Sequence, residues 1–539
     1  MKHTLLLLIL LANACLKSIA QPVIKVQKTI GGSFFDDLRS MYLTKDGGLI
    51  VGGSSESDSS GDKTEDNTGI IDYWLVKLNK KGKIQWDKTI GGSYDDQLSC
   101  IQQTSDGGYI LGGSSESNRS GQKSENSKGS YDYWVVKLDR SGNIEWDKTI
   151  GGSDYDALAC LEQTCDGGYI LGGQSFSNKS GDKTGNSRGA DDYWVVKLDK
   201  HGKVQWDKTI GGSDFDVLYS LQQTNDSGYI LGGSSTSNIS GEKTENSRGD
   251  YDYWIVKLDK HGRIQWDKTI GGSDFDVLHA IQQTSDGGYI LGGTSSSGIS
   301  GEKTESNRGL YHSDYWIVKL SSEAQIQWDK TIGGVDDDFL YSLQQTSDKG
   351  YILGGYSYSN TSGEKTENSK GEDDYWVVKI NKYGKVEWDK TIGGNHFERL
   401  SSIKEIQKNW YMLGGSSSSD ISGDKTENPR GGPYDQDYWV VVLQYKKPQN
   451  ITSRISNDLQ KSLSENKSGL LVFPNPVKDV LHVQTGVKTT VQLTDQSGRI
   501  LITQNVSGSG FLNVSHLPVG LYYLKNTITG ETQKIIIVR

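Results

Sequence analysis

The chain has 539 residues, with 58 Lys and Arg against 68 Asp and Glu, and therefore a formal net charge of −10. A surface of this sign repels polyanions, which argues against nucleic acid or an anionic membrane as a partner. Of the four cysteines, Cys15 lies in the N-terminal segment described next. The odd number that remains excludes a complete disulfide framework.

Residues 1–20 have the pattern of a secretory signal peptide. Lys2 gives a basic start, an apolar run follows at residues 4–11, and Ser18-Ile19-Ala20 forms a small-residue cleavage site. The apolar run is too short to cross a bilayer, so we expect no membrane span. Residues 12–15 (ANAC) leave lipidation of Cys15 as an alternative, although Ala12 replaces the leucine usual in a lipoprotein box.

Between residues 21 and 446, variants of one unit of about 60 residues recur seven times. In the copy at residues 206–270, alternating residues 217–224 lead through a turn into 229–231, a polar loop follows, and two further apolar segments cover 253–258 and 264–270. Four short strands per period, without helical periodicity, are typical of a propeller blade. We therefore predict an all-β chain with a seven-bladed β-propeller of four-stranded antiparallel blades.

The two ends of the repeat region predict how the ring closes. Residues 23–32 (VIKVQKTIGG) match the fourth strand of a blade without the preceding three, and the last copy ends at residues 438–445 with its third strand. We expect the N-terminal strand to complete the last blade, which leaves no exposed sheet edge.

The repeats resemble kelch propeller blades, in which a strand ends in a double glycine and a later Asp precedes a Trp. The double glycines are Gly52-Gly53, Gly112-Gly113, Gly172-Gly173, Gly232-Gly233, Gly292-Gly293, Gly354-Gly355 and Gly414-Gly415. Because the interval from Asp199 to Trp206 and the polar loop are both longer than in kelch blades, the resemblance is to a kelch-like repeat.

Residues 447–468 are polar and unpatterned, so we interpret them as a linker. Residues 469–539 then contain Phe473-Pro474-Asn475-Pro476, Asp495-Gln496-Ser497-Gly498-Arg499 and the run 517–523 (LPVGLYY). In these motifs and their order the segment is similar to the C-terminal sorting domain of type IX secretion, found in the Bacteroidetes.

The resemblance implies a small Ig-like β-sandwich, which the type IX secretion machinery would recognise through residues 469–539. It also implies passage through the periplasm and a final location outside the cell or on its outer surface. An ordinary adhesive or carbohydrate-binding sandwich is the alternative for this segment.

Topology places the links between blades and the long polar loops on one face of the ring, which we call the loop face, and the tight hairpin turns on the other, the tight-turn face. Each link carries a carboxylate just before the first strand: Asp36, Asp96, Asp156, Asp216, Asp276, Asp338 and Glu398. These residues are candidates to bind a sugar or a cation such as calcium. The alternative, which we favour, is that each caps its own turn.

A second set opens the DYW strands and has the same two interpretations: Asp72, Asp132, Asp192, Asp252, Asp314, Asp374 and Asp437. The tryptophans of these strands are expected to pack between blades, while Trp410 takes a position that other copies give to a turn glycine. The loop motif at residues 240–246 (SGEKTEN) is polar but lacks the ligand pattern of a calcium-binding loop.

No sequence signature of an enzyme is present. We interpret the chain as a non-catalytic module on the cell surface that binds a glycan or a protein, with no cofactor except possible calcium. The alternative is a polysaccharide-active enzyme, a glycoside hydrolase or lyase, that uses loop-face carboxylates. The copies depart from the repeat at residues 310–313, 396, 398–399 and 431–436, so an asymmetric site is expected there.

Overall fold

The computed structural model describes residues 21–432, 434–446 and 469–539. The predicted signal peptide and the predicted linker therefore lie outside the described residues. The chain divides into two compact units, with the boundary along the sequence between residues 446 and 447. Every named element in the described ranges is a β-strand, and a search of these ranges finds no helix that could cross a membrane.

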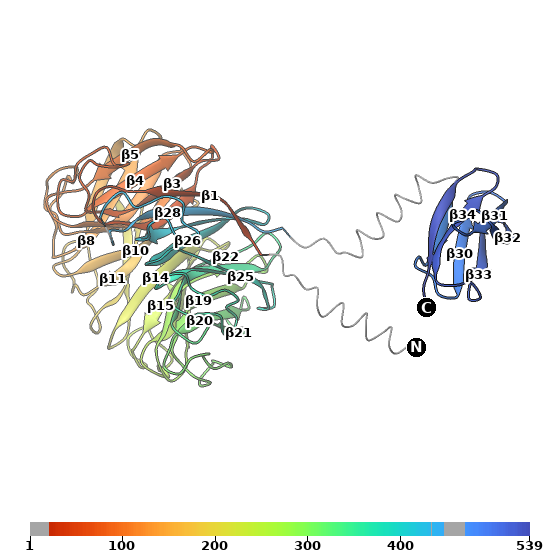
Figure 1. Cartoon of the computed structure of the whole chain (residues 1–539). Helices are drawn as coiled ribbons and strands as arrows, with labels where there is room; N and C mark the ends of the chain where they lie inside the picture. The colour runs from red at the N-terminus through yellow and green to blue at the C-terminus, as the bar shows by residue number, and fades with distance from the viewer. Residues whose placement is uncertain (1–20, 433, 447–468) are drawn as a thin grey trace. The chain divides into compact units, whose positions relative to one another are not determined.

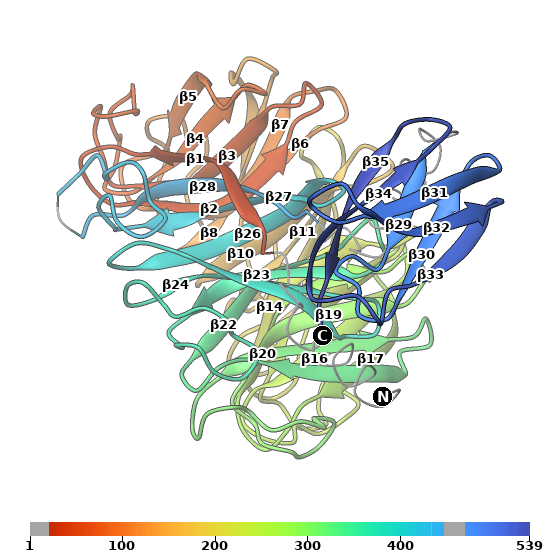
Figure 2. The same cartoon turned by 45° about the vertical axis from the view of Figure 1, so that its right-hand side comes forward.

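Seven four-stranded antiparallel sheets form the N-terminal unit, and Figures 1 and 2 show them following one another in chain order. Blade 1 contains β2 (Asp36–Leu43), β3 (Leu49–Ser55), β4 (Asp72–Leu78) and β5 (Ile84–Ile90). Blade 2 contains β6 (Asp96–Gln103), β7 (Tyr109–Ser115), β8 (Asp132–Leu138) and β9 (Ile144–Ile150). Blade 3 contains β10 (Asp156–Gln163), β11 (Tyr169–Ser175), β12 (Asp192–Leu198) and β13 (Val204–Ile210).

The remaining blades follow the same plan. Blade 4 contains β14 (Asp216–Gln223), β15 (Tyr229–Ser235), β16 (Asp252–Leu258) and β17 (Ile264–Ile270). Blade 5 contains β18 (Asp276–Gln283), β19 (Tyr289–Ser295), β20 (Asp314–Leu320) and β21 (Ile326–Ile332). Blade 6 contains β22 (Asp338–Gln345), β23 (Tyr351–Ser357), β24 (Asp374–Ile380) and β25 (Val386–Ile392). Blade 7 contains β26 (Glu398–Gln407), β27 (Trp410–Ser417), β28 (Asp437–Gln444) and, from the N-terminus, β1 (Val23–Ile30).

The pairing of β1 with β28 confirms the predicted closure. The two strands run antiparallel, from Val23 opposite Gln444 to Ile30 opposite Tyr438. The Oε1 atom of Gln27 accepts a hydrogen bond from the indole N–H of Trp439 at 3.2 Å. In the regular blades an aspartate of the fourth strand makes this contact, so β1 replaces a fourth strand in its side-chain bonding as well as in its backbone pairing.

The core lies between the blades. Each of seven clusters of buried apolar side chains combines residues from two neighbouring sheets. The hydroxyl of Tyr193 in blade 3 donates to the carbonyl of Trp254 in blade 4 at 3.0 Å, and their rings lie 4.8 Å apart. The same bond joins every other pair of neighbours and ends with Tyr438 of blade 7 donating to Trp74 of blade 1 at 3.1 Å. The DYW tryptophans therefore pack between blades, as predicted.

The position of each strand in its blade determines what it can offer to a ligand. The first strands contact one another in turn and form the inner wall of the ring: β2, β6, β10, β14, β18, β22 and β26. The third strands are buried along their whole length in blades 1 to 6. Trp410, which we placed at a turn position, begins strand β27 and pairs with Gln444. The third strands of blades 1 to 6 therefore offer no exposed side chain to a ligand.

The C-terminal unit is a two-sheet sandwich. One sheet has the order β29-β30-β33, and the other has the order β32-β31-β34-β35. The strands are β29 (Leu470–Phe473), β30 (Val480–Thr485), β31 (Thr489–Thr494), β32 (Ile500–Val506), β33 (Ser509–Asn513), β34 (Gly520–Asn526) and β35 (Thr532–Ile537). Leu481, Val491, Leu512 and Leu524, each 0% exposed, pack in one core between the sheets.

Candidate functional site

The link carboxylates predicted from the sequence are buried inside their own turns. Asp216 is 0% exposed, and its Oδ2 atom accepts hydrogen bonds from the N–H of Gly212 at 2.6 Å and from Ser237 Oγ at 3.0 Å. All seven members have the first of these bonds: Asp36, Asp96, Asp156, Asp216, Asp276, Asp338 and Glu398. This is the geometry of the capping alternative, in which the carboxylate satisfies the backbone of its own link.

The structure does not bring these carboxylates together around one centre. In the parts of the chain that the structure describes, no group of three His, Cys, Asp or Glu side chains could hold a metal ion. Burial raises the pKa of Asp216 and Asp276 to about 6 and that of Glu398 to about 7, because an ionised carboxylate is poorly solvated there. Calcium binding at these residues stays a prediction.

The second set of aspartates caps the ends of the long loops. The Oδ2 atom of Asp192 accepts hydrogen bonds from the N–H of Arg188 at 2.7 Å and from Ser187 Oγ at 2.8 Å. A Cβ added at Gly211 would lie 1.7 Å from the Oδ1 atom of Asp192. The close approach explains why the link needs glycine at this position.

The recurring loop motif also has a local structural role. Lys243 of SGEKTEN is 2% exposed, donates to Thr269 Oγ1 at 3.0 Å and lies 5.8 Å from the ring centroid of Trp254. Thr244 donates from its N–H and its hydroxyl to Asp267 at 3.0 and 2.6 Å. Residues of the motif thus tie the loop to the third and fourth strands, which accounts for its recurrence.

A different group of side chains gathers at the loop-face end of the inner wall, on blades 6 and 7. We call it the aromatic–arginine cluster, and it consists of Phe339, Tyr341, Tyr356, Tyr358 and Arg399. The rings of Tyr341 and Tyr356 stack at 5.6 Å with an angle of 19° between their planes. Tyr341 keeps 37% of its surface exposed, so part of the cluster's aromatic surface remains available to a ligand.

Arg399 is fixed beside these rings by a buried carboxylate. Its Nε atom lies 3.1 Å from Asp373 Oδ2, its Nη2 atom lies 3.5 Å from the hydroxyl of Tyr358, and its guanidinium carbon lies 5.3 Å from the ring centroid of Tyr356. The side chain of Asp373 is fully buried, whereas that of Arg399 is 47% exposed. The pair presents oriented N–H donors next to an aromatic face, a combination suited to hydroxyl or carboxylate groups on a ring-shaped ligand.

The aromatic wall continues from this cluster onto blades 5 and 4. The imidazole of His279 stacks on Tyr341 at 4.7 Å and lies 5.2 Å from the ring of Tyr219. Burial lowers the pKa of His279 to about 4, so the imidazole is uncharged at neutral pH. The inner wall of blades 4 to 6 therefore offers rings, and blade 7 offers a cation.

The cluster replaces a structural contact of the regular blades. Ser234 in blade 4 accepts a hydrogen bond from the N–H of Leu278 in the next blade at 3.1 Å. In blade 6 the equivalent residue is Tyr356, whose ring packs in the cluster instead. The departure at Arg399 was noted from the sequence, but the aromatic residues were not. Comparison of the copies at these inner-wall positions could have found them.

One further carboxylate lies at the same end of the ring. Asp191 precedes β12 and is 2% exposed, and its Oδ1 atom has no hydrogen-bond partner among the described residues. Burial raises its pKa to about 7. Asp373 holds the equivalent position in blade 6, where it pairs with Arg399. The repeat thus presents the same residue in two electrostatic environments.

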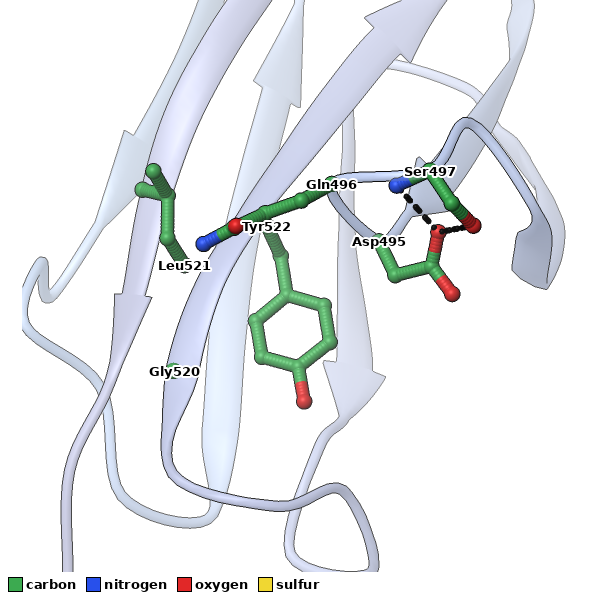
Figure 3. Close-up of a pocket in the computed structure, with 6 residues that line it drawn as sticks. All are labelled: Asp495, Gln496, Ser497, Gly520, Leu521 and Tyr522. Carbon is green, nitrogen blue, oxygen red and sulfur yellow. Dashed lines mark hydrogen bonds between the residues drawn. The ribbon is translucent and has the colours of Figure 1, made fainter.

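The sorting-type motifs of the C-terminal sandwich meet at one hollow of about 340 Å³. Figure 3 shows Asp495 accepting hydrogen bonds from the N–H and the hydroxyl of Ser497, with Tyr522 beside this turn. The hydroxyl of Tyr522 donates to the carbonyl of Pro518 at 2.8 Å. The motifs at residues 495–499 and 517–523 are therefore joined in space as a turn and an adjacent strand.

Comparison with known families identifies the C-terminal unit. Residues 471–538 match the secretion system C-terminal sorting domain. This domain marks the chain for export by type IX secretion, to the cell surface or out of the cell, and implies an interaction with the secretion machinery.

The comparisons also include a distant curated relative of the chain. Over 385 residues the chain is 21% identical to the regulatory protein FlaEY of Caulobacter vibrioides, an alignment that covers 66% of this chain and 39% of that protein. The chain thus spans about two fifths of the length of this curated relative.

Solved structures with a similar arrangement share little sequence with the chain. Sqt1 from Chaetomium thermophilum is 10% identical, covering 78% of this chain and 100% of its own, with a TM-score of 0.39. The Pan2 WD40 domain of Neurospora crassa is 10% identical, covering 78% of this chain and 97% of its own, with a TM-score of 0.40. Such similarity carries no argument about function, and the propeller assignment rests on the strand topology described above.

Proposed function

We propose that the protein is an exported, non-catalytic propeller that binds a glycan at the loop-face end of its inner wall. The observation that supports this most directly is that the partly exposed ring of Tyr341 and the partly exposed guanidinium of Arg399 both pack against Tyr356. Sugar rings present C–H groups that pack on aromatic faces, and they present hydroxyl groups that accept hydrogen bonds from a guanidinium. Blade 6 has Tyr356 at the position of Ser234 and so lacks the hydrogen bond that Ser234 accepts from the next blade. Such a loss is expected where ligand binding, rather than the stability of the scaffold, determines which residue stands at a position.

Calorimetric titration of residues 21–539 with oligosaccharides, chosen by a glycan-array screen, tests the proposal. We expect Tyr341→Ala and Arg399→Ala each to weaken binding by about tenfold or more, equivalent to about 1.4 kcal/mol. Tyr94→Ala is the matched control, because Tyr94 is a loop-face aromatic residue with 53% exposure outside the cluster. It should bind as the parent does.

Two results would contradict the proposal. One is a parent protein that binds no oligosaccharide of the array. The other is parent-like affinity of both cluster variants. The sequence also predicts a protein as an alternative ligand. Candidate protein ligands would then be tested for weaker binding to the same two variants.

A second candidate function is a polysaccharide-active enzyme, and Asp191 favours it. A carboxyl group with a pKa of about 7 is about half protonated at neutral pH, and the protonated form is the state required of a general acid. Under this hypothesis the bound oligosaccharide would be cleaved during prolonged incubation, and Asp191→Asn would stop cleavage. Chromatography of the oligosaccharide after incubation distinguishes the two functions, because a binding module returns it intact.

A further inference from the structure

A groove of about 630 Å³ lies between blades 5 and 6 on the tight-turn face, at the opposite end of the blades from the loop face. Blade 5 contributes the turn residues Ser285 and Asp286 and the strand residue Trp328, among others. Blade 6 contributes Lys349 from one hairpin and Tyr383 from the other. The aromatic–arginine cluster supplies none of its lining residues, so the groove is a separate feature of the ring.

The inner part of the groove is built from residues that recur in the blades. The indole of Trp328 packs edge-on against Tyr351 with ring centroids 6.0 Å apart. A Cβ at Gly384 would lie 3.1 Å from the indole, so the hairpin of blade 6 covers part of this ring. Lys319, almost fully buried, pairs with Asp286 at 3.2 Å. These contacts make a fixed base with no net charge of its own.

The rim of the groove departs from the repeat at Lys349 and Tyr383. Lys349 has a φ of 68° where blade 5 has Gly287, and a left-handed backbone disfavours a side chain at this position. Tyr383, 69% exposed, stands where blade 5 has Glu323, and Lys382 stands where blade 5 has Ser322. Lys382 is the usual residue of the repeat, as at Lys80, Lys200 and Lys260, so this groove is distinguished by the added cation of Lys349 and the added ring of Tyr383 beside that lysine.

The charges of the rim are not neutralised by the protein. Within the described ranges, neither Lys349 nor Lys382 has a carboxylate within 4.0 Å, and the nearby Asp286 is already paired with Lys319. The ammonium of Lys382 lies 4.8 Å from the ring centroid of Tyr383. In a chain with a net charge of −10, two unpaired lysines beside an exposed ring form a local site for an anion that also has a flat, apolar face.

We propose that this groove binds an acidic saccharide, with its sugar ring on Tyr383 and its carboxylate or sulfate group at Lys349 and Lys382. The proposal is independent of the loop-face site, since the two sites share no residue. An exported protein with both sites could hold two glycans at opposite ends of its blades.

The test uses residues 21–539 and calorimetric titration with two acidic probes, an oligogalacturonate and a sulfated galactan oligosaccharide. The methyl-esterified oligogalacturonate and a desulfated galactan are the neutral probes. The groove variant Lys349→Gly/Lys382→Ser/Tyr383→Glu takes the residues that blade 5 has at these three positions. The control variant Lys260→Ser/His261→Glu makes the corresponding change in the hairpin of blade 4.

We expect at least one acidic probe to bind the parent and the control alike, and the groove variant to bind it about tenfold or more weakly. Binding should weaken with added salt and be absent for the matching neutral probe. Tyr341→Ala should leave it unchanged, which separates this site from the loop-face site. The proposal is overturned if neither acidic probe binds the parent, if the groove variant binds like the parent, or if the neutral probe binds equally well.

Discussion

Blades 4 and 6 have the same scaffold but differ in the residues they present on the inner wall. In both, the DYW tryptophan is 0% exposed, and its indole N–H donates to an aspartate of the fourth strand, at 3.0 Å for Trp254 and 3.1 Å for Trp376. Yet blade 4 has Ser234 bonded to the next blade where blade 6 has Tyr356 in an aromatic cluster. The two blades keep the contact of the buried tryptophan with an aspartate constant and vary the residue that follows the double glycine.

The largest effect should be the same in both blades. Trp254→Ala and Trp376→Ala each remove a fully buried indole and take one hydrogen-bond donor from an aspartate of the fourth strand, so each should destabilise the propeller by about 3 to 5 kcal/mol. The shift of the urea unfolding midpoint measures the effect. A much smaller loss in blade 6 than in blade 4 would show that the scaffold is not constant around the ring.

A smaller effect, shared by all blades, is a loss of stability as the pH rises. Burial raises the pKa of Asp216 and Asp276 from 3.8 to about 6. Between these values the folded state holds protons that the unfolded chain has released, so folding stability decreases as the pH increases through this range. We expect the melting temperature to be at least a few degrees higher at pH 5 than at pH 7.5.

Asparagine keeps an oxygen that can accept the link hydrogen bonds but does not titrate. Asp216→Asn/Asp276→Asn should therefore show a weaker decrease in melting temperature over the same pH range. An identical decrease in the parent and the variant would rule out these carboxylates as its source. The comparison also separates capping from calcium binding, because a cation site would lose a calcium-dependent rise in melting temperature in the variant.

Much of the fold could be predicted from the sequence because the repeat shows it seven times. Three features are encoded by local sequence that does not depend on the neighbouring blade. They are the strand pattern, the closing strand at residues 23–32 and the sorting domain at residues 469–539. The kelch-like resemblance stays a prediction. Local patterns of this kind determine backbone pairing, and backbone pairing is what the prediction of a propeller requires.

The candidate sites were harder to predict, because a side chain's direction depends on the neighbouring blade. Asp216 was singled out for recurring in every copy, and the structure shows its carboxylate bonded to the backbone of its own link. At the repeat positions of Tyr356 and Tyr383, only one copy has a tyrosine. The significance of these two residues depends on residues of other strands or blades that only the folded ring brings near. In a repeat protein, departures from the pattern are therefore better guides to a ligand site than recurrence.

The smallest expected effect concerns the hydrogen bond between neighbouring blades that blade 6 lacks at Tyr356. Ser234→Ala removes the acceptor for the N–H of Leu278, which lies in a buried part of the junction between blades 4 and 5. The loss should be about 1 kcal/mol, the usual cost of one hydrogen bond whose partner stays buried. Tyr356→Ala should weaken glycan binding by a much larger factor than Ser234→Ala does, since only Tyr356 belongs to the cluster. Urea unfolding and calorimetry on both variants measure the two effects separately, and equal effects on binding would contradict the assignment of the ligand to blade 6.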